Sequence, residues 1–203
     1  MAAVGTCSSA DVAFSEYYVG LTGSAKGRYR EKVFTCGFDP YVLKKSECSE
    51  DLADYPSVEY PDIVNYLVLQ TSWITGQQMK AYKSMDAYNF FVSGWVNTIF
   101  TKPAAGTDKV VVTARVNHSQ RAIDTPLKTW LLAEKDGTVC MAHCICICIC
   151  ITAGLCEACS HVGALLFAIE AGVRMRESGN MHAGKKQVGN AFICEGNSLH
   201  SCL

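Results

Sequence analysis

Cysteine and histidine side chains gather in one short part of this sequence. Seven of the 12 cysteines fall within residues 140–159, and His161 follows closely. Thiolate sulfur and imidazole nitrogen are ligands that Zn²⁺ prefers, and a structural zinc site takes four ligands in a tetrahedron. A Cys-x-Cys pair in a strand supplies two of them from one face, because side chains alternate along a strand. The spacing therefore predicts a zinc site made from a Cys-x-Cys pair and the segment Cys159-Ser160-His161.

The choice of Cys-x-Cys pair is ambiguous, because residues 144–151 repeat the dipeptide Cys-Ile. The pair nearer the last predicted helix leaves eight residues before Cys159, and the pair nearer the preceding hairpin leaves twelve. The free energies of closing these two loops differ by only about 0.4 kcal/mol. We choose the shorter gap. The predicted ligands are Cys148, Cys150, Cys159 and His161, with Cys144 and Cys146 as the alternative pair.

A second chemistry is open to the same cysteines. Cys156-Glu157-Ala158-Cys159 is a C-x-x-C motif before a predicted helix, the position in which thiol–disulfide oxidoreductases activate a thiol. Those enzymes place the motif near a βαβ unit, whereas the strands here carry hairpin signals. A zinc enzyme would need an open ligand position and a well-placed carboxylate, and Glu157 is the one local candidate. The sequence favours a protein that is not an enzyme, with an oxidoreductase using Cys156 and Cys159 as the alternative.

The elements that must position these residues change period along the chain. Apolar residues every three to four positions predict helices over residues 21–34, from Pro61 onward, over 77–90 and over 160–175. A period of two predicts strands over residues 91–101, 109–118, 129–134 and 138–150. Asp136-Gly137 predicts a tight hairpin turn between the last two strands. The cysteines and His161 thus lie between the end of a hairpin and the start of the last helix.

These elements predict an α+β protein with a helical N-terminal half, a small antiparallel sheet and a ββα zinc finger. We expect residues 1–55 to form an N-terminal segment with a short helix and an acidic linker, the linker continuing to residue 60. Residues 56–108 would hold helices and the first strand, and residues 109–178 a strand and the zinc finger. The polar tail, residues 179–203, shows no periodicity, and we expect it to be disordered.

Charge restricts the partners. The formal net charge is −1, so the chain as a whole does not attract nucleic acid. Residues 101–130 carry five basic and two acidic side chains, a local excess of +3. A basic helix face formed by Lys26, Arg28, Arg30 and Lys32 is interpreted as solvated. No glycine-rich phosphate loop and no aromatic and basic platform for a single strand stands out in the sequence. We expect the partner to be DNA or a protein, and no small-molecule substrate is identified.

The compartment follows from the N-terminus and the cysteines. The first 14 residues contain no Lys or Arg and no sustained apolar run, unlike a signal peptide, which favours an intracellular protein of the nucleus or cytoplasm. Residues 137–156 contain no charged side chain and are long enough to span a membrane. Their strict alternation is typical of a strand, so we expect no membrane association.

The cysteine motif resembles the SWIM-type zinc finger, whose pattern is C-x-C, a variable gap and C-x-H in a ββα arrangement. The similar segments read Asp136-Gly-Thr-Val-Cys-Met-Ala-His-Cys-Ile-Cys146 and Cys159-Ser-His-Val-Gly-Ala-Leu-Leu-Phe167. Residues 116–121 and 60–68 are similar to the segments before the finger in animal, notably fish, proteins. The resemblance implies Zn²⁺ binding and recognition of DNA or a protein. The repeated C-x-C and Cys156 depart from the pattern, and the exonuclease-like domain of some relatives has no counterpart here, so nuclease activity is not implied.

Overall fold

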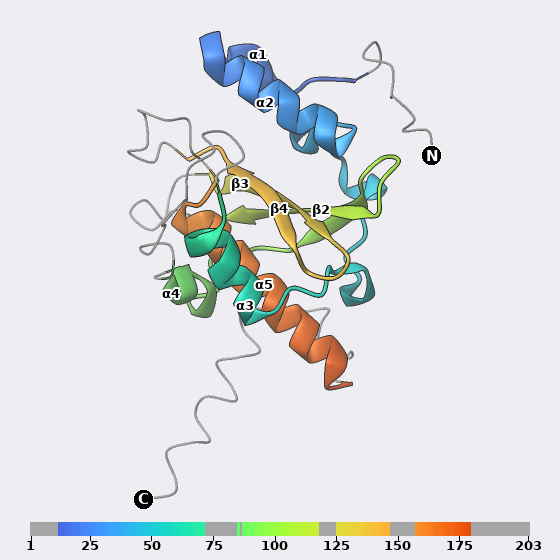
Figure 1. The fold of residues 1–203 in the computed structure, drawn as a ribbon, viewed down its shortest axis with the longest axis vertical. Coiled ribbons are helices and arrows are strands. Elements are labelled where there is room, and N and C mark those ends of the chain that lie inside the picture. Colours follow the sequence, from blue (N-terminus) through green and yellow to red (C-terminus); the bar gives the residue numbers. More distant parts are fainter. Residues whose placement is uncertain (1–11, 72–84, 86, 118–124, 147–156, 180–203) are drawn as a thin grey trace, which may run out of the picture.

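A four-stranded antiparallel sheet lies at the centre of the protein (Figure 1). The structure is a computed structural model that describes residues 12–71, 85, 87–117, 125–146 and 157–179. The strands follow chain order across the sheet: β1 (Phe100–Pro103), β2 (Lys109–Val116), β3 (Leu127–Glu134) and β4 (Val139–Cys144). The α+β class and the helical N-terminal half predicted from the sequence are confirmed.

Five α-helices accompany the sheet in the described residues. They are α1 (Glu16–Gly20), α2 (Gly23–Cys36), α3 (Tyr60–Val64), α4 (Ala87–Val92) and α5 (Ser160–Glu177). A π-helical turn, η4 (Asn65–Leu69), continues α3. Three short 3₁₀ turns connect α2 to α3: η1 (Pro40–Val42), η2 (Lys45–Glu47) and η3 (Leu52–Asp54). The helices predicted over residues 21–34 and 160–175 are therefore found close to their expected bounds.

Helices cover both faces of the sheet, with α1 and α2 on one side and α3, α4 and α5 on the other (Figure 1). Because side chains alternate along each strand, Val111 and Trp130 pack with α2, whereas Val112 and Leu131 pack with α5. Strand β3 is buried on both faces, which explains why its residues 130–133 are all apolar. The core consists of two layers, one on each side of this strand.

Helix α5 is the most buried helix of the fold. The apolar positions predicted from its period are all buried: Val162, Leu165, Leu166, Ile169 and Val173. The opposite side is covered as well, because α3, α4 and η3 pack against it. Gly172 allows this approach, since a Cβ there would lie 2.8 Å from the ring of Tyr55. The start of α5 is therefore held in place by contacts along the whole helix.

Two sequence-based expectations are corrected. The strand predicted over residues 91–101 begins only at Phe100, because α4 continues to Val92 and buries Phe91 in the core. The backbone then turns at Gly94, whose φ of 69° is the left-handed conformation that glycine adopts easily. The segment 46–60, interpreted as a linker, instead packs against the core through Leu52, Tyr55 and Val58.

Other predicted elements are described in part. The helix from Pro61 is found as α3 and η4. Of the helix predicted over residues 77–90 the structure describes residues 85 and 87–90, and of the strand over residues 138–150 it describes the part up to residue 146. The remaining positions and the tail from residue 180 onward lie outside the described residues.

The hairpin turn before β4 gives a test of the fold. Gly137 has a φ of 106°, and a Cβ at this position would collide with the backbone carbonyl of Ser57. We expect Gly137→Ala to lower the free energy of unfolding by about 1–3 kcal/mol, because it adds backbone strain and a clash. Gly27→Ala is the matched control: this site in α2 has open space around it, and alanine favours a helix by up to about 1 kcal/mol. Thermal unfolding measures both variants. Equal melting temperatures for Gly137→Ala and Gly27→Ala would contradict the described geometry of the turn.

Candidate metal centre

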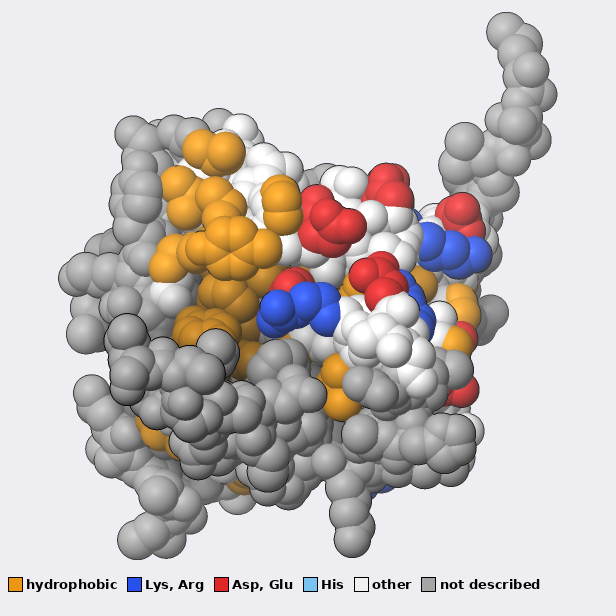
Figure 2. Space-filling model, turned by 90° about the horizontal axis from the view of Figure 1, so that it is seen from below, with side chains coloured by type: hydrophobic (Ala, Val, Ile, Leu, Met, Phe, Trp, Pro, Cys, Tyr) orange, Lys and Arg blue, Asp and Glu red, His pale blue; other side chains and the backbone are white. Residues whose placement is uncertain are grey.

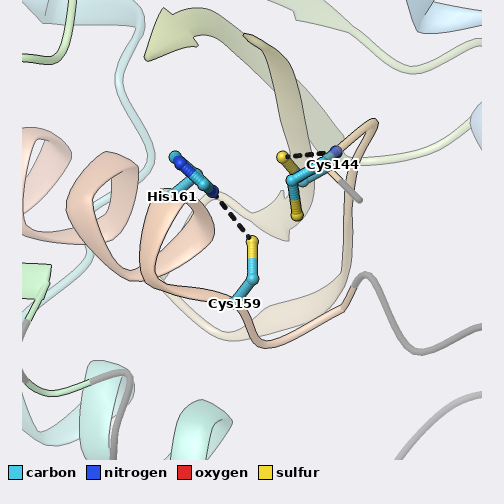
Figure 3. Close-up of side chains that lie close together, drawn as sticks. Cys144, Cys159 and His161 are labelled. Atoms are coloured by element: carbon cyan, nitrogen blue, oxygen red, sulfur yellow. Dashed lines mark hydrogen bonds between the residues drawn. The ribbon is translucent and has the colours of Figure 1, made fainter. Parts of the chain in front are cut away.

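The end of β4 and the start of α5 bring four potential metal ligands together. Cys144 is the last residue of β4, and Cys146 follows two residues later. Cys159 is the N-cap of α5, and His161 lies in its first turn. One ligand atom from each of these four residues lies within 4.8 Å of every other. Figure 3 shows Cys159 and His161 directed from the helix start toward the side where Cys144 lies.

The alternation of side chains along β4 explains which of its residues face the ligand cluster. Cys144 and Ala142 face the core layer of α5, whereas His143 between them faces the layer of α2. There the Nε2 atom of His143 and the hydroxyl of Tyr17 form a hydrogen bond of 2.9 Å, and aromatic rings surround the imidazole. Burial lowers the pKa of His143 well below its usual value, so the ring is neutral. His143 is thus a core residue and no ligand of the cluster, despite its place beside Cys144.

One distance within the cluster is close to that of a tetrahedral zinc site. Zn–S bonds of about 2.3 Å and Zn–N bonds of about 2.0–2.1 Å place tetrahedral sulfurs about 3.8 Å apart and a sulfur and nitrogen about 3.5 Å apart. The Sγ atom of Cys159 lies 3.7 Å from Nδ1 of His161. Three sulfur ligands and one imidazole form a common donor set of structural zinc sites. The donor set and the closeness of its four ligand atoms therefore suit Zn²⁺.

Burial makes the cluster a closed site. The exposed fraction is 0% for Cys144, 7% for Cys146, and 9% for both Cys159 and His161. Catalytic zinc sites keep one position open for water or substrate, whereas structural sites are filled by four protein ligands. Four buried ligand side chains around one point leave little room for a fifth group. The arrangement could hold a metal ion, and its burial suits a structural rather than a catalytic site.

Electrostatics at Cys144 favour metal binding. Hydrogen bonds from the thiols of Cys146 and Cys159 lower the pKa of Cys144 well below its usual value, and burial opposes them without cancelling them. The hydroxyl of Thr129 and the backbone N–H of Cys146 each lie 3.4 Å from its Sγ atom. Because a metal binds the thiolate rather than the thiol, these donors prepare the ligand that the ion needs.

A buried ion pair holds the chain segment directly before α5. The Nζ atom of Lys32 in α2 lies 2.9 Å from a carboxylate oxygen of Glu157, and both side chains are 1% exposed. The same ammonium donates a hydrogen bond of 2.7 Å to the carbonyl of Ala142, on β4. The hydroxyl of Tyr66 donates to the carbonyl of Glu157. Lys32 therefore connects α2 to both chain segments that supply the metal ligands.

Lys32 corrects the sequence interpretation, which placed it on a solvated basic face. Tyr29, Val33 and Cys36 are buried at the spacing of one helix face, and Lys32 lies on that same face. The period of α2 could have indicated this, because positions i, i+3, i+4 and i+7 share one side. No comparable signal marked Glu157 as its partner.

The sequence-predicted ligands divide into two groups. Cys159 and His161 lie together with Cys144 and Cys146, which were the alternative pair. Cys148 and Cys150, the pair chosen for the shorter gap, lie outside the described residues, as does Cys156 of the C-x-x-C motif. The described cluster is thus Cys144, Cys146, Cys159 and His161.

Comparisons of the chain with protein-family models, with curated proteins and with solved structures found no match. Among the described helices, none combines the length and the apolar composition that crossing a membrane requires.

Proposed function

We propose that this protein binds one Zn²⁺ ion through Cys144, Cys146, Cys159 and His161, as a SWIM-type structural site. The observation that carries the proposal is the approach of four ligand atoms to within 4.8 Å in a buried place. When bound, the ion supplies a cross-link between the end of β4 and the start of α5. The residues' own contribution is to present three sulfurs and one imidazole in the order C-x-C and C-x-H.

A structural site of this kind serves recognition rather than catalysis. Four protein ligands leave no open position for a substrate, so the chain is proposed to act without enzyme activity. The ββα unit would present its outer surfaces to DNA or to a protein. Two features of the described surface bear on this choice, and they lie on opposite sides of the sheet.

An apolar surface on the α5 side supports a protein partner. Tyr60 and Tyr88 are 53% and 45% exposed, and together with Phe167 they line a groove of about 470 Å³. Figure 2 shows hydrophobic side chains gathered on one part of the face seen from below. Contiguous apolar surface is typical of protein interaction sites.

On the other side of the sheet, Arg115 and Lys128 are exposed on neighbouring strands and suit an anionic partner.

A cysteine series tests the ligand assignment. We expect Cys144→Ser and Cys146→Ser each to weaken zinc binding by more than the roughly 10- to 100-fold that loss of a supporting contact around a metal causes. Cys140→Ser is the matched control, because this thiol lies on β4 outside the cluster, near Lys109. Competition with a chelator of known zinc affinity measures all three.

The repeat Cys-Ile adds a second arm to this experiment. A shift of two residues keeps the same strand face, so the alternative to the described pair is a downstream pair such as Cys148 and Cys150. The described pair predicts that Cys148→Ser keeps zinc affinity near that of the parent chain. If Cys148→Ser loses zinc and Cys144→Ser keeps it, the ligand assignment is wrong while zinc binding itself stands. Folded protein with two reactive thiols and no metal would instead favour the oxidoreductase alternative.

A further inference from the structure

A basic pocket lies where residues 40–48 pass beside strands β1, β2 and β3. Its volume is about 420 Å³, within the range of about 300–1,000 Å³ that small-molecule sites occupy. None of the described residues that line it is acidic. Four of them are cationic: Lys44, Lys45, Arg115 and Lys128.

Two of these cations face one another in the sheet. Arg115 in β2 and Lys128 in β3 are direct cross-strand partners, so their side chains leave the sheet on the same face. Like charges directly opposite one another in a sheet are destabilising. The ion pairs found among the described residues involve neither side chain. Arg115 and Lys128 therefore repel one another, and a bound anion would relieve this repulsion.

The nearest acidic residue on the same loop does not cancel this charge. Glu47 accepts a hydrogen bond of 3.2 Å from the backbone N–H of Lys44, and its carboxylate lies 3.8 Å from the Nζ atom of Lys102. Glu47 does not line the pocket. The pocket therefore keeps its positive potential although an acidic side chain is close.

The loop that closes the pocket is held in place by buried contacts. The fully buried carboxylate of Asp39 accepts hydrogen bonds from the hydroxyl of Tyr29 at 2.7 Å and from the backbone N–H of Tyr41 at 2.9 Å. The hydroxyl of Tyr41 then donates to the backbone carbonyl of Lys128 at 3.3 Å. This chain of contacts joins α2, η1 and β3, so the wall is preformed rather than created by a ligand.

The remaining lining suits more than a single phosphate ion. Phe100 presents a half-buried ring, and the Nζ atom of Lys45 lies 5.4 Å from its centroid. Asn97, Thr98 and Thr113 add neutral polar groups. An aromatic ring beside cations is the combination on which proteins bind the base and the phosphate of a nucleotide.

We infer that this pocket binds a phosphate-bearing ligand of nucleotide size, with Arg115 and Lys128 contacting the phosphate. The ligand is a free nucleotide or one nucleotide of a single strand, because both present the same chemistry to the pocket. The site shares no residue with the metal cluster. It goes beyond the proposed zinc function and stands or fails separately from it.

Calorimetric titration of the zinc-loaded full chain tests the inference, with inorganic phosphate, AMP and a single-stranded oligothymidylate as probes at low ionic strength. We expect AMP to bind and phosphate to compete with it. Arg115→Ala should weaken binding by at least about tenfold, since it removes a charge-assisted hydrogen bond. Arg28→Ala is the matched control, because it removes the same charge from a half-buried position of α2 outside the pocket. Much tighter binding of the oligonucleotide than of AMP would identify a nucleic acid strand as the source.

A second variant separates binding from folding. Lys128→Gln removes the repulsion with Arg115, so the ligand-free protein should melt at the same temperature as the parent chain or higher, while AMP binding weakens. Absence of binding by all three probes to the folded parent chain would overturn the inference. Equal weakening by Arg28→Ala and Arg115→Ala would overturn it as well, because it would show that net charge rather than the pocket attracts the ligand.

Discussion

His161→Ala should release the zinc ion and expose the backbone amides of β4 and of the first turns of α5 to hydrogen exchange. In the proposed site the ion would hold these two segments together, and apparent zinc-binding free energies of small structural sites reach about 10–16 kcal/mol. Helix α4 should lose protection with them, because it packs on α5, with the rings of Tyr88 and Phe167 5.3 Å apart. Helix α2 on the other face should lose protection later.

Hydrogen exchange followed by mass spectrometry resolves this order. Cys159→Ser should behave in the same way, because it removes another ligand at the start of α5. The parent chain treated with a strong zinc chelator should reproduce both variants without any substitution. Unchanged protection of α5 after verified removal of zinc would show that packing alone holds the helix, and that the ion is not structural.

Lys32→Met should destabilise the protein by about 3–5 kcal/mol, because it leaves the carboxylate of Glu157 buried without its counter-ion. The effect extends to the metal site, because Lys32 also binds the carbonyl of Ala142, two residues before Cys144. We therefore expect weaker zinc binding together with the loss of stability. Chemical denaturation with and without added zinc measures both effects.

Two further variants identify the cause. Lys32→Met combined with Glu157→Gln should recover part of the lost stability, because no unpaired charge then remains in the core. Lys135→Met removes a lysine from a surface pair with Asp108, whose side chains are 70% and 87% exposed, and should change stability little. If the double variant is as unstable as the sum of its single variants, the two groups are not coupled and the ion pair has no special role.

Local patterns predicted the part of the fold that depends on local rules. Alternating apolar residues predicted the positions of β2 and β4, and the spacing of apolar residues in α5 identified its buried face. The Asp136-Gly137 turn and the C-x-H segment could also be predicted from the sequence, because both depend on neighbouring residues. Strand parity also explains why Cys144 faces the same core layer as Ala142.

The features that the sequence did not reveal depend on contacts distant in the chain. The period of α2 could have placed Lys32 on the buried face, but its ion pair was not predictable because the partner, Glu157, is 125 residues away in the sequence. The segment with Leu52 and Tyr55 was taken for a linker because its acidic residues dominate the composition, although its apolar residues pack on α5. The choice between Cys-x-Cys pairs rested on loop entropy, whose difference of about 0.4 kcal/mol is too small to decide it.

Zinc content and zinc-dependent protection of thiols test directly whether the four-residue cluster binds one zinc ion. Native mass spectrometry of the folded chain, followed by alkylation with and without a chelator, gives both. We expect one zinc ion per chain and three cysteines that react only after chelation, identified by peptide mapping as Cys144, Cys146 and Cys159. A folded chain without zinc, or the same alkylation pattern with and without chelator, would contradict this expectation.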